Sequence, residues 1–344
     1  MANTNDEARR GAQNAAVTIR DVAERAGVAV STASRALGNG SASEATREKV
    51  RRAAMELNFV PNAAAKRLPS GRSNVVALVV NEPTTFLFQD DFISGMLGQL
   101  SLSLTSRGLL PFLVLASPED SEGFNDLLMR SGCEGVIVAS IHEGRALIDN
   151  LKKFDKPAVF VGKPPESFKC PFVDVDNFDG GFQAGHRLLE RGCTRLAVIE
   201  GPRDMPTPRE RTAGFRAALQ EAGLEPVATY SGSYEMQNGI ASMERIIKEH
   251  PEVDGVFAHS DRIAAGVIHV LARNNKRVPE DVAVVGFDDL QVATLLNPQL
   301  TTLAQPVADL ADAAAEMLHH RLNTGEWKVM SQRFPVRLVV RESA

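Results

Sequence analysis

The 344-residue sequence has few cysteines and no long hydrophobic run. Its three cysteines, Cys133, Cys170 and Cys193, are odd in number and far apart. They match neither a zinc-binding pattern nor a C-x-x-C motif, so we expect reduced thiols. No apolar run approaches the roughly 18 residues of a membrane span. The polar first 16 residues lack the apolar core of a signal peptide, which favours a frayed tail on a cytoplasmic protein.

The sequence also lacks the motifs of common enzymes. It has no H-E-x-x-H, no P-loop and no G-x-S-x-G motif. The pairs Asp288-Asp289 and His319-His320 could be imagined as metal ligands, but adjacent residues on a helix point in different directions. Two aspartates at a strand end are more often a cap and a ligand acceptor. We therefore expect no catalytic activity, no cofactor and no metal site.

Charge is distributed unevenly along the chain. Residues 1–72 carry a net charge of +5, and the remainder carries −10. A basic end on an acidic body indicates that only the end meets a polyanion such as DNA.

Residues 17–60 show the pattern of a helix-turn-helix unit. Thr18 can accept a hydrogen bond at the start of a first helix, and Gly27 supplies the residue tolerant of positive φ that ends it. A second helix over 30–37 then presents small and hydroxyl side chains, with Arg35 near its end. Ser43 can cap a third helix. This arrangement is typical of a DNA-reading head.

The segment 61–72 allows two interpretations. Residues 63–68 are good helix formers, but two turns of helix are marginal in water. The segment is either a solvated connector or a hinge helix that folds on DNA. In the second case Lys66 and Arg67 lie near phosphates and Leu68 enters a minor-groove step.

From residue 75 onward, short runs of Val, Ile and Leu alternate with helical patterns. The predicted strands are 75–80, 112–116, 135–139, 158–161, 196–199, 255–258 and 282–287. The predicted helices are 91–107, 121–130, 145–154, 178–191, 209–222, 238–249 and 262–274. Strands alternating with helices imply parallel sheets covered on both faces, and about seven strands over this length fit two doubly wound subdomains.

Small and polar residues follow these strands, as expected for a ligand site. They are Asn81-Glu82, Ser117, Ser140, Gly162-Lys163, Gly201-Pro202, Ser260-Asp261 and Asp288-Asp289. Open α/β sheets bind ligands at the carboxyl ends of their strands, so these positions predict a site for a polyhydroxylated or heterocyclic small molecule. For any single residue, a role as a helix cap or turn remains the alternative.

The sequence resembles the LacI/GalR family of bacterial transcription repressors over nearly its whole length. Beyond the head at 18–37 and the segment 57–68, the matching blocks are 173–177, 211–215, 260–266, 278–289 and 298–303. The resemblance implies an all-α helix-turn-helix DNA-binding head joined to an α/β core. That core would consist of two doubly wound parallel-sheet subdomains, similar to periplasmic binding proteins.

The resemblance also implies a domain organisation. The predicted parts are a disordered tail over 1–16, the head over 17–60, a hinge helix and linker over 61–72, and an effector-binding and dimerisation domain over 73–344. Within that domain the N-subdomain would comprise about 73–175 and 304–331, and the C-subdomain about 176–303 and 332–344. The protein would bind pseudo-palindromic operator DNA as a homodimer, with a tetramer as a further option. It would act in the cytoplasm, at the nucleoid, without a membrane.

Family positions assign roles in the head and hinge. Val30, Ser31 and Arg35 correspond to base readers: arginine suits bidentate contact with guanine, whereas valine offers only apolar contact. Positions implied near phosphates or in the hinge contacts are Thr18, Thr32, Ser34, Asn62, Ala65 and Leu68. Ala29 stands where the family usually has a serine cap, which would cost the reading helix about 1 kcal/mol.

Four positions match the family's effector site: Phe92, Arg211, Ser260 and Asp288. Arg211 could fork onto two hydroxyls or a carboxylate, Asp288 could accept from hydroxyls, and Phe92 offers a flat face for a sugar ring. Ser260 replaces a frequent asparagine.

These features favour a repressor of a carbohydrate-utilisation operon, whose operator affinity changes when a small molecule, expected to be a sugar, binds between the subdomains. One alternative is a regulator of the same family that responds to a nucleobase or a phosphoprotein as co-repressor. A sugar-binding transport protein would suit the body alone, but the head argues against it.

Overall fold

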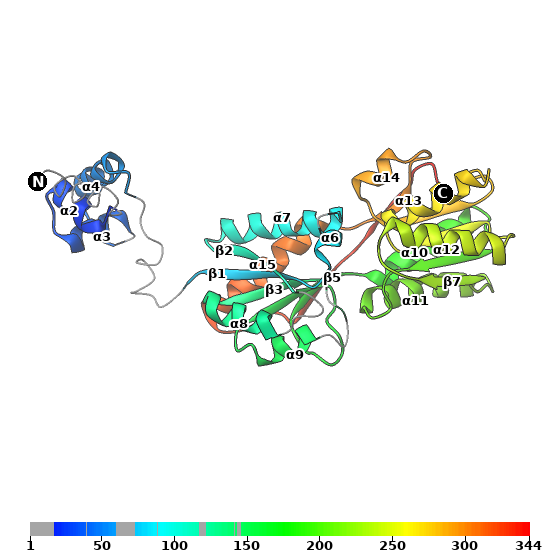
Figure 1. Ribbon diagram of the computed structural model, residues 1–344, viewed down its shortest axis with the longest axis horizontal. Helices are drawn as coiled ribbons and strands as arrows, with labels where there is room; N and C mark the ends of the chain where they lie inside the picture. The colour runs from blue at the N-terminus through cyan, green and yellow to red at the C-terminus, as the bar shows by residue number, and fades with distance from the viewer. Residues whose placement is uncertain are drawn as a thin grey trace, which may run out of the picture. The chain divides into compact units, whose positions relative to one another are not determined.

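The computed structural model shows two compact units, Met1–Ser73 and Asn74–Ala344 (Figure 1). It describes residues 17–38, 40–59, 73–87, 89–116, 122–140, 142 and 146–344. The predicted tail, the whole predicted hinge and linker over 61–72 with its residues Asn62, Ala65 and Leu68, and Ser117 lie outside the described residues.

In the first unit, the described residues form three helices: α2 (Ile19–Ala26), α3 (Val30–Leu37) and α4 (Glu44–Glu56). Their buried side chains are almost all alanine and valine, so the helices pack closely around a small core. Gly27 ends α2 at a φ of 61°, as predicted. The Arg47 guanidinium donates to the carbonyls of Ala36, Gly38 and Gly40, and it thereby holds the loop between α3 and α4.

The second unit begins with a six-stranded parallel sheet in the order β11-β5-β4-β3-β1-β2. Its strands are β1 (Val75–Val80), β2 (Leu110–Leu115), β3 (Gly135–Ala139), β4 (Ala158–Val161), β5 (Phe172–Val175) and β11 (Ser331–Phe334). Helices α7 (Asp91–Ser106) and α15 (Val307–Thr324) cover one face, and α8 (Glu122–Ser131) and α9 (Ala146–Lys153) cover the other (Figure 1). The short helix α6 (Thr84–Leu87) follows β1. All side chains of β1 are buried because both faces are covered.

A second six-stranded sheet has the order β12-β10-β9-β8-β6-β7. Its strands are β6 (Leu196–Glu200), β7 (Ala228–Ser231), β8 (Gly255–Ala258), β9 (Ala283–Asp288), β10 (Thr301–Ala304) and β12 (Arg337–Val339), and β12 pairs antiparallel with β10. Its helices are α10 (Asn177–Glu190), α11 (Pro206–Glu221), α12 (Met236–Glu249), α13 (Asp261–Arg273) and α14 (Gln291–Leu295). Helices α10 and α11 pack on one face, and α12 and α13 pack on the other.

Close packing of α10 on α11 depends on glycine. A Cβ at Gly181 would collide with the carbonyl of Arg211, and a Cβ at Gly214 would collide with the carbonyl of Phe178. The two backbones therefore touch directly. This contact fixes Arg211, at the middle of α11, relative to the start of α10.

The chain crosses between the two sheets three times: after β5, after β10 and after β11. The predicted fold class of two doubly wound subdomains is confirmed. One boundary is corrected: Ser331–Phe334 pairs with β5 in the first sheet, so the last crossing follows Phe334 and not residue 331. The side chains of this strand are mostly exposed and polar, so their pattern gave no sign of the backbone pairing.

The seven predicted strands are all present, but the described residues form twelve. The three cysteines are buried and unpaired, and burial raises the pKa of Cys170 to about 12. Within the described residues, no helix is long and apolar enough to cross a membrane, and no group of three or more His, Cys, Asp or Glu side chains could hold a metal.

Candidate effector site and DNA-reading helix

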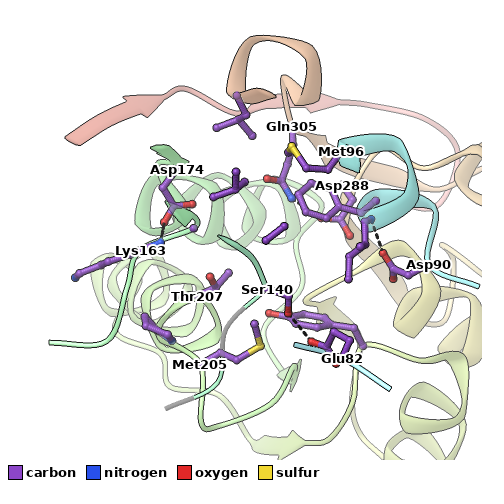
Figure 2. Close-up of a pocket in the computed structure, with 18 of the residues that line it drawn as sticks. Glu82, Asp90, Met96, Ser140, Lys163, Asp174, Met205, Thr207, Asp288 and Gln305 are labelled. Carbon is purple, nitrogen blue, oxygen red and sulfur yellow. Dashed lines mark hydrogen bonds between the residues drawn. The ribbon is translucent and has the colours of Figure 1, made fainter. Parts of the chain in front are cut away.

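A cavity lies where the carboxyl ends of strands from both sheets meet (Figure 2). It holds about 900 Å³ of space free of protein atoms, part of it open to solvent. Four of the predicted post-strand positions contribute to its wall, namely Glu82, Ser140, Gly162-Lys163 and Asp288. The strand ends therefore build one common site from both subdomains, as open α/β sheets do.

Arg211 belongs to the C-subdomain wall of the cavity and is almost fully buried. Its Nε donates to Asn177 Oδ1 at 3.0 Å, and its Nη1 donates to the carbonyl of His259 at 2.5 Å. Its Cζ lies 3.4 Å from the centroid of the Phe287 ring. The guanidinium is thus held in one plane before any ligand arrives, while other N–H donors remain for a ligand in the cavity.

Asp288 ends β9 next to this guanidinium. Its Oδ1 lies 3.9 Å from Arg211 Nη2 and accepts a hydrogen bond of 2.6 Å from Gln305 Nε2. Burial raises the pKa of Asp288 well above its ordinary value, and the positive charge of Arg211 opposes this effect. Its neighbour Asp289 bonds to Arg341 at 2.6 Å instead, so the two aspartates do not act as a pair.

Asp174 is a second buried carboxylate in the cavity wall. It accepts hydrogen bonds from the backbone N–H of Lys163 at 3.0 Å and of Val175 at 2.8 Å, and from Asn177 Nδ2 at 3.1 Å. Burial raises the pKa of Asp174 to about 6, although the hydrogen bonds from Val175 and Lys163 lower it. The carboxylate orients Asn177, which in turn receives the Arg211 Nε–H.

Glu82 forms a third polar group with Ser140 and His142. Ser140 Oγ donates to Glu82 Oε1 at 2.5 Å, and His142 Nε2 lies 3.0 Å from the same oxygen. The other His142 nitrogen lies 2.9 Å from Asp204 Oδ1, which belongs to the C-subdomain. Burial lowers the pKa of His142, but its hydrogen bonds and charge interactions with Glu82 and Asp204 outweigh burial, so the pKa is raised overall.

Polar contacts join the subdomains beside the cavity. Besides His142–Asp204, Lys163 Nζ of the N-subdomain lies 2.7 Å from Glu210 Oε1 on α11. Arg262 of α13 donates to the carbonyl of Gln89 at 2.8 Å. A ligand that entered the cavity would therefore act on a set of cross-subdomain contacts.

Three of the four predicted effector residues line this cavity: Phe92, Arg211 and Asp288. The structure does not bring Ser260 to the cavity wall. Its Oγ accepts from the Ile263 N–H at 3.2 Å, as the N-cap of α13, and donates to the carbonyl of Tyr234 at 3.3 Å. The helix-cap alternative therefore describes Ser260 better than ligand contact does.

Several lining residues are not among the four effector positions that the family resemblance implied. Glu82, Ser140 and Lys163 carried a signal, because each follows a strand. Asp174 lies inside β5, while Tyr234 and Gln305 lie in loops. Asp174 stands in the matching block 173–177, whereas Tyr234 and Gln305 lie outside every block and follow no predicted strand, so no pattern in the sequence marks them.

The predicted base readers lie on the outer face of α3. Val30, Ser31 and Arg35 are exposed, as is Ser34, while Thr32 is half-buried. Arg35 Nε donates to the carbonyl of Ser31 at 3.2 Å. Ala29 is the N-cap of α3, and its methyl side chain forms no capping hydrogen bond. At the start of α2, the Thr18 N–H and hydroxyl both donate to Asp21 Oδ2 at 2.7 Å, and these bonds lower the pKa of Asp21.

Comparison with known proteins assigns both units. Residues 18–62 match the model of bacterial regulatory proteins of the lacI family, and residues 186–344 match a periplasmic binding protein-like domain. The HTH-type transcriptional regulator CelR of Thermobifida fusca is 39% identical over 331 residues, covering 94% of this chain and 95% of CelR. The chain belongs to the LacI family of bacterial regulatory proteins. It is accordingly a DNA-binding transcriptional regulator.

Other LacI-family proteins agree with this assignment. The ribose operon repressor of Escherichia coli (strain K12) is 30% identical over 313 residues, covering 89% of this chain and 93% of the repressor. A solved complex of the transcriptional regulator CelR with cellobiose superposes with a TM-score of 0.76 at 35% identity, covering 95% of this chain and all of that one. A lac repressor dimer bound to operator and an anti-inducer has a TM-score of 0.85 at 24% identity and covers 96% of this chain and 99% of that one, which supports the fold.

Proposed function

We propose that this LacI-family regulator represses a carbohydrate-utilisation operon, and that a β-linked glucose disaccharide of the cellobiose type is its effector. The observation that carries the proposal is the composition of the cavity wall. A pre-oriented guanidinium (Arg211), carboxylates (Glu82, Asp174 and Asp288) and an aromatic face (Phe92) suit a neutral ligand rich in hydroxyls. The similarity to CelR, whose complex with cellobiose is solved, supports a glucose disaccharide.

The control mechanism is a shift between two arrangements of the subdomains. The effector contacts both walls of the cavity, so it changes the balance of the cross-subdomain contacts at His142, Lys163 and Arg262. It changes operator affinity only as far as it binds one arrangement better than the other. No catalytic step is part of this proposal, and the bound sugar leaves unchanged.

The DNA-bound form is a homodimer on a pseudo-palindromic operator. Each copy places α3, with Val30, Ser31 and Arg35, in the major groove of one half-site. Exposed leucines on the adjacent elements α7 and β2, with Leu102 67% and Leu110 58% exposed, support pairing of two copies. As a regulator of genes, the protein would act in the cytoplasm at the nucleoid.

The test is release of operator DNA. A fluorescent duplex from upstream of the protein's own gene is bound to the full-length protein, and cellobiose, ribose and adenine are each titrated in. Cellobiose should release the duplex at far lower concentration than ribose. If neither sugar changes operator binding and adenine strengthens it, the sugar proposal is refuted and the protein is a regulator with a nucleobase as co-repressor.

Asp288→Asn provides a variant of nearly the same size for this test. The amide replaces one carboxyl oxygen with an NH2 group and so removes an acceptor for sugar hydroxyls, and we therefore expect operator binding to persist and the response to cellobiose to weaken. Asp281→Asn is the matched control, because Asp281 is paired with Arg277 away from the cavity. An unchanged cellobiose response in Asp288→Asn would remove Asp288 from the site.

A further inference from the structure

A second depression lies directly beside the effector cavity and shares Lys163 and Pro206 with it. We call it the side groove. Its remaining wall comes from residues 164–167 after β4, from Phe178 on α10, from Arg209, Glu210 and Ala213 on α11, and from Arg333 on β11. The side groove therefore draws on both subdomains, like the effector cavity itself.

The ion pair between Lys163 and Glu210 stands where the two spaces meet. Lys163 lines both of them, and its side chain extends away from the other labelled residues of the cavity (Figure 2). The two side chains are 33% and 21% exposed, so the pair is accessible from outside. The Lys163 ammonium has three N–H donors and the Glu210 carboxylate has several lone pairs. Both groups can therefore form further hydrogen bonds with hydroxyl groups of a ligand that extends from the cavity into the side groove.

Phe178 gives the side groove an aromatic wall. It is the second residue of α10, and 46% of its surface is exposed. Its backbone is fixed against Gly214 of α11, so the ring stands on a rigid support. An exposed phenyl ring on such a support can pack against the apolar C–H face of a sugar ring.

The charges of the side groove are largely matched. Glu210 lies 2.7 Å from Lys163 and 3.9 Å from Arg333, and Glu166 adds a second carboxylate to the wall. An anionic ligand would have to compete with these carboxylates for the basic groups. A neutral, hydroxyl-rich chain would meet both donors and acceptors without leaving a buried charge unpaired.

We infer that the side groove is an additional sugar subsite, and that the protein binds β-linked glucose oligosaccharides longer than a disaccharide. The disaccharide unit occupies the effector cavity, and the following glucose unit passes Lys163–Glu210 and packs on Phe178. This inference rests on the proposed function, since it extends the same ligand beyond the cavity. It predicts an effector preference based on chain length.

Isothermal titration of the full-length protein tests this, with cellobiose, cellotriose and cellotetraose as ligands. We expect the Kd to fall about tenfold from cellobiose to the longer chains, the size of one added aromatic contact. Phe178→Ala should raise the Kd of cellotriose to that of cellobiose and leave the cellobiose Kd unchanged. Phe178→Tyr should keep the chain-length gain, and His186→Ala, exposed on the same helix but outside the side groove, should behave as the natural protein.

The possible results separate the two proposals. If cellobiose binds, and cellotriose and cellotetraose bind with equal or weaker affinity than cellobiose, the subsite is refuted and the proposed function stands. An equal loss of affinity for all three sugars in Phe178→Ala would also overturn it, because the ring would then only support the fold. No binding of any of the three would refute the proposed function, and the subsite with it.

Discussion

Replacing Arg211 with lysine keeps the positive charge of the cavity wall but removes the planar fork. The guanidinium bonds to Asn177 Oδ1 and to the carbonyl of His259 from two different nitrogens and stacks on Phe287. A lysine ammonium is a single nitrogen on a flexible stem, so it cannot reproduce this arrangement. One hydrogen bond from a charged donor is worth about 1.5–3 kcal/mol, and the ring contact about 0.5–2 kcal/mol.

Arg211→Lys should therefore lower the free energy of unfolding by about 2–5 kcal/mol. It should also cost the effector one charge-assisted bond of about 1.5–3 kcal/mol, which raises its Kd roughly 10- to 150-fold. Thermal unfolding measures the first effect, and calorimetric titration with cellobiose measures the second. Arg216→Lys is the control, because Arg216 lies on the same helix with its side chain 45% exposed, outside the cavity.

The two measurements distinguish binding from support. A lower Tm with an effector Kd unchanged within threefold would show that Arg211 only braces the wall, and it would refute our use of this residue as a ligand contact. Operator affinity in the absence of effector should stay near that of the natural protein, since the head is a separate compact unit.

Three further changes test other parts of the molecule. Gly214→Ala places a Cβ against the carbonyl of Phe178 and should destabilise the body by more than about 3 kcal/mol in urea unfolding; a loss below 1 kcal/mol would contradict the direct backbone contact. The pKa of His142 is raised in the folded protein, where its ring lies between Glu82 and Asp204. The protonated ring therefore stabilises the fold to its full extent at any pH below 6.5, the ordinary pKa of histidine, and this contribution is lost as the pH rises through the raised pKa. His142→Gln should thus lower the Tm more at pH 6 than at pH 9, and the opposite trend would count against the bridge. Arg35→Ala should relax preference at one operator base pair by about 1–3 kcal/mol in binding assays with substituted operators, whereas a uniform loss on all DNA would indicate a phosphate contact.

Strands buried on both faces could be predicted from the sequence because they consist of short unbroken runs without polar side chains. Strands β1, β3, β4 and β8 have the predicted bounds. Strands with polar residues, such as β7 and β10, gave no such run. Helix α15 was missed because alanines make up much of its buried stripe, and α7 packs directly on it. Small side chains permit that close contact but give a weak periodic signal.

The lining of the candidate effector cavity could be predicted in part, for a related reason. Arg211 and Asp288 stand in segments that resemble family blocks, and both line the cavity. Ser260 stands in such a segment too, but a hydroxyl at the start of a helix bonds to the helix itself. Tyr234 and Gln305 come from loops, and their position depends on how distant segments fold together.

The three crossings between the sheets have a consequence for synthesis on the ribosome. Helix α15 and strand β11 cover and extend the first sheet, yet they follow nearly all of the second. While translation proceeds, the N-subdomain therefore exposes the apolar face that α15 later covers, and it depends on chaperones or on its own solubility until then. A premature stop codon after β10 would damage the half of the body that was translated first.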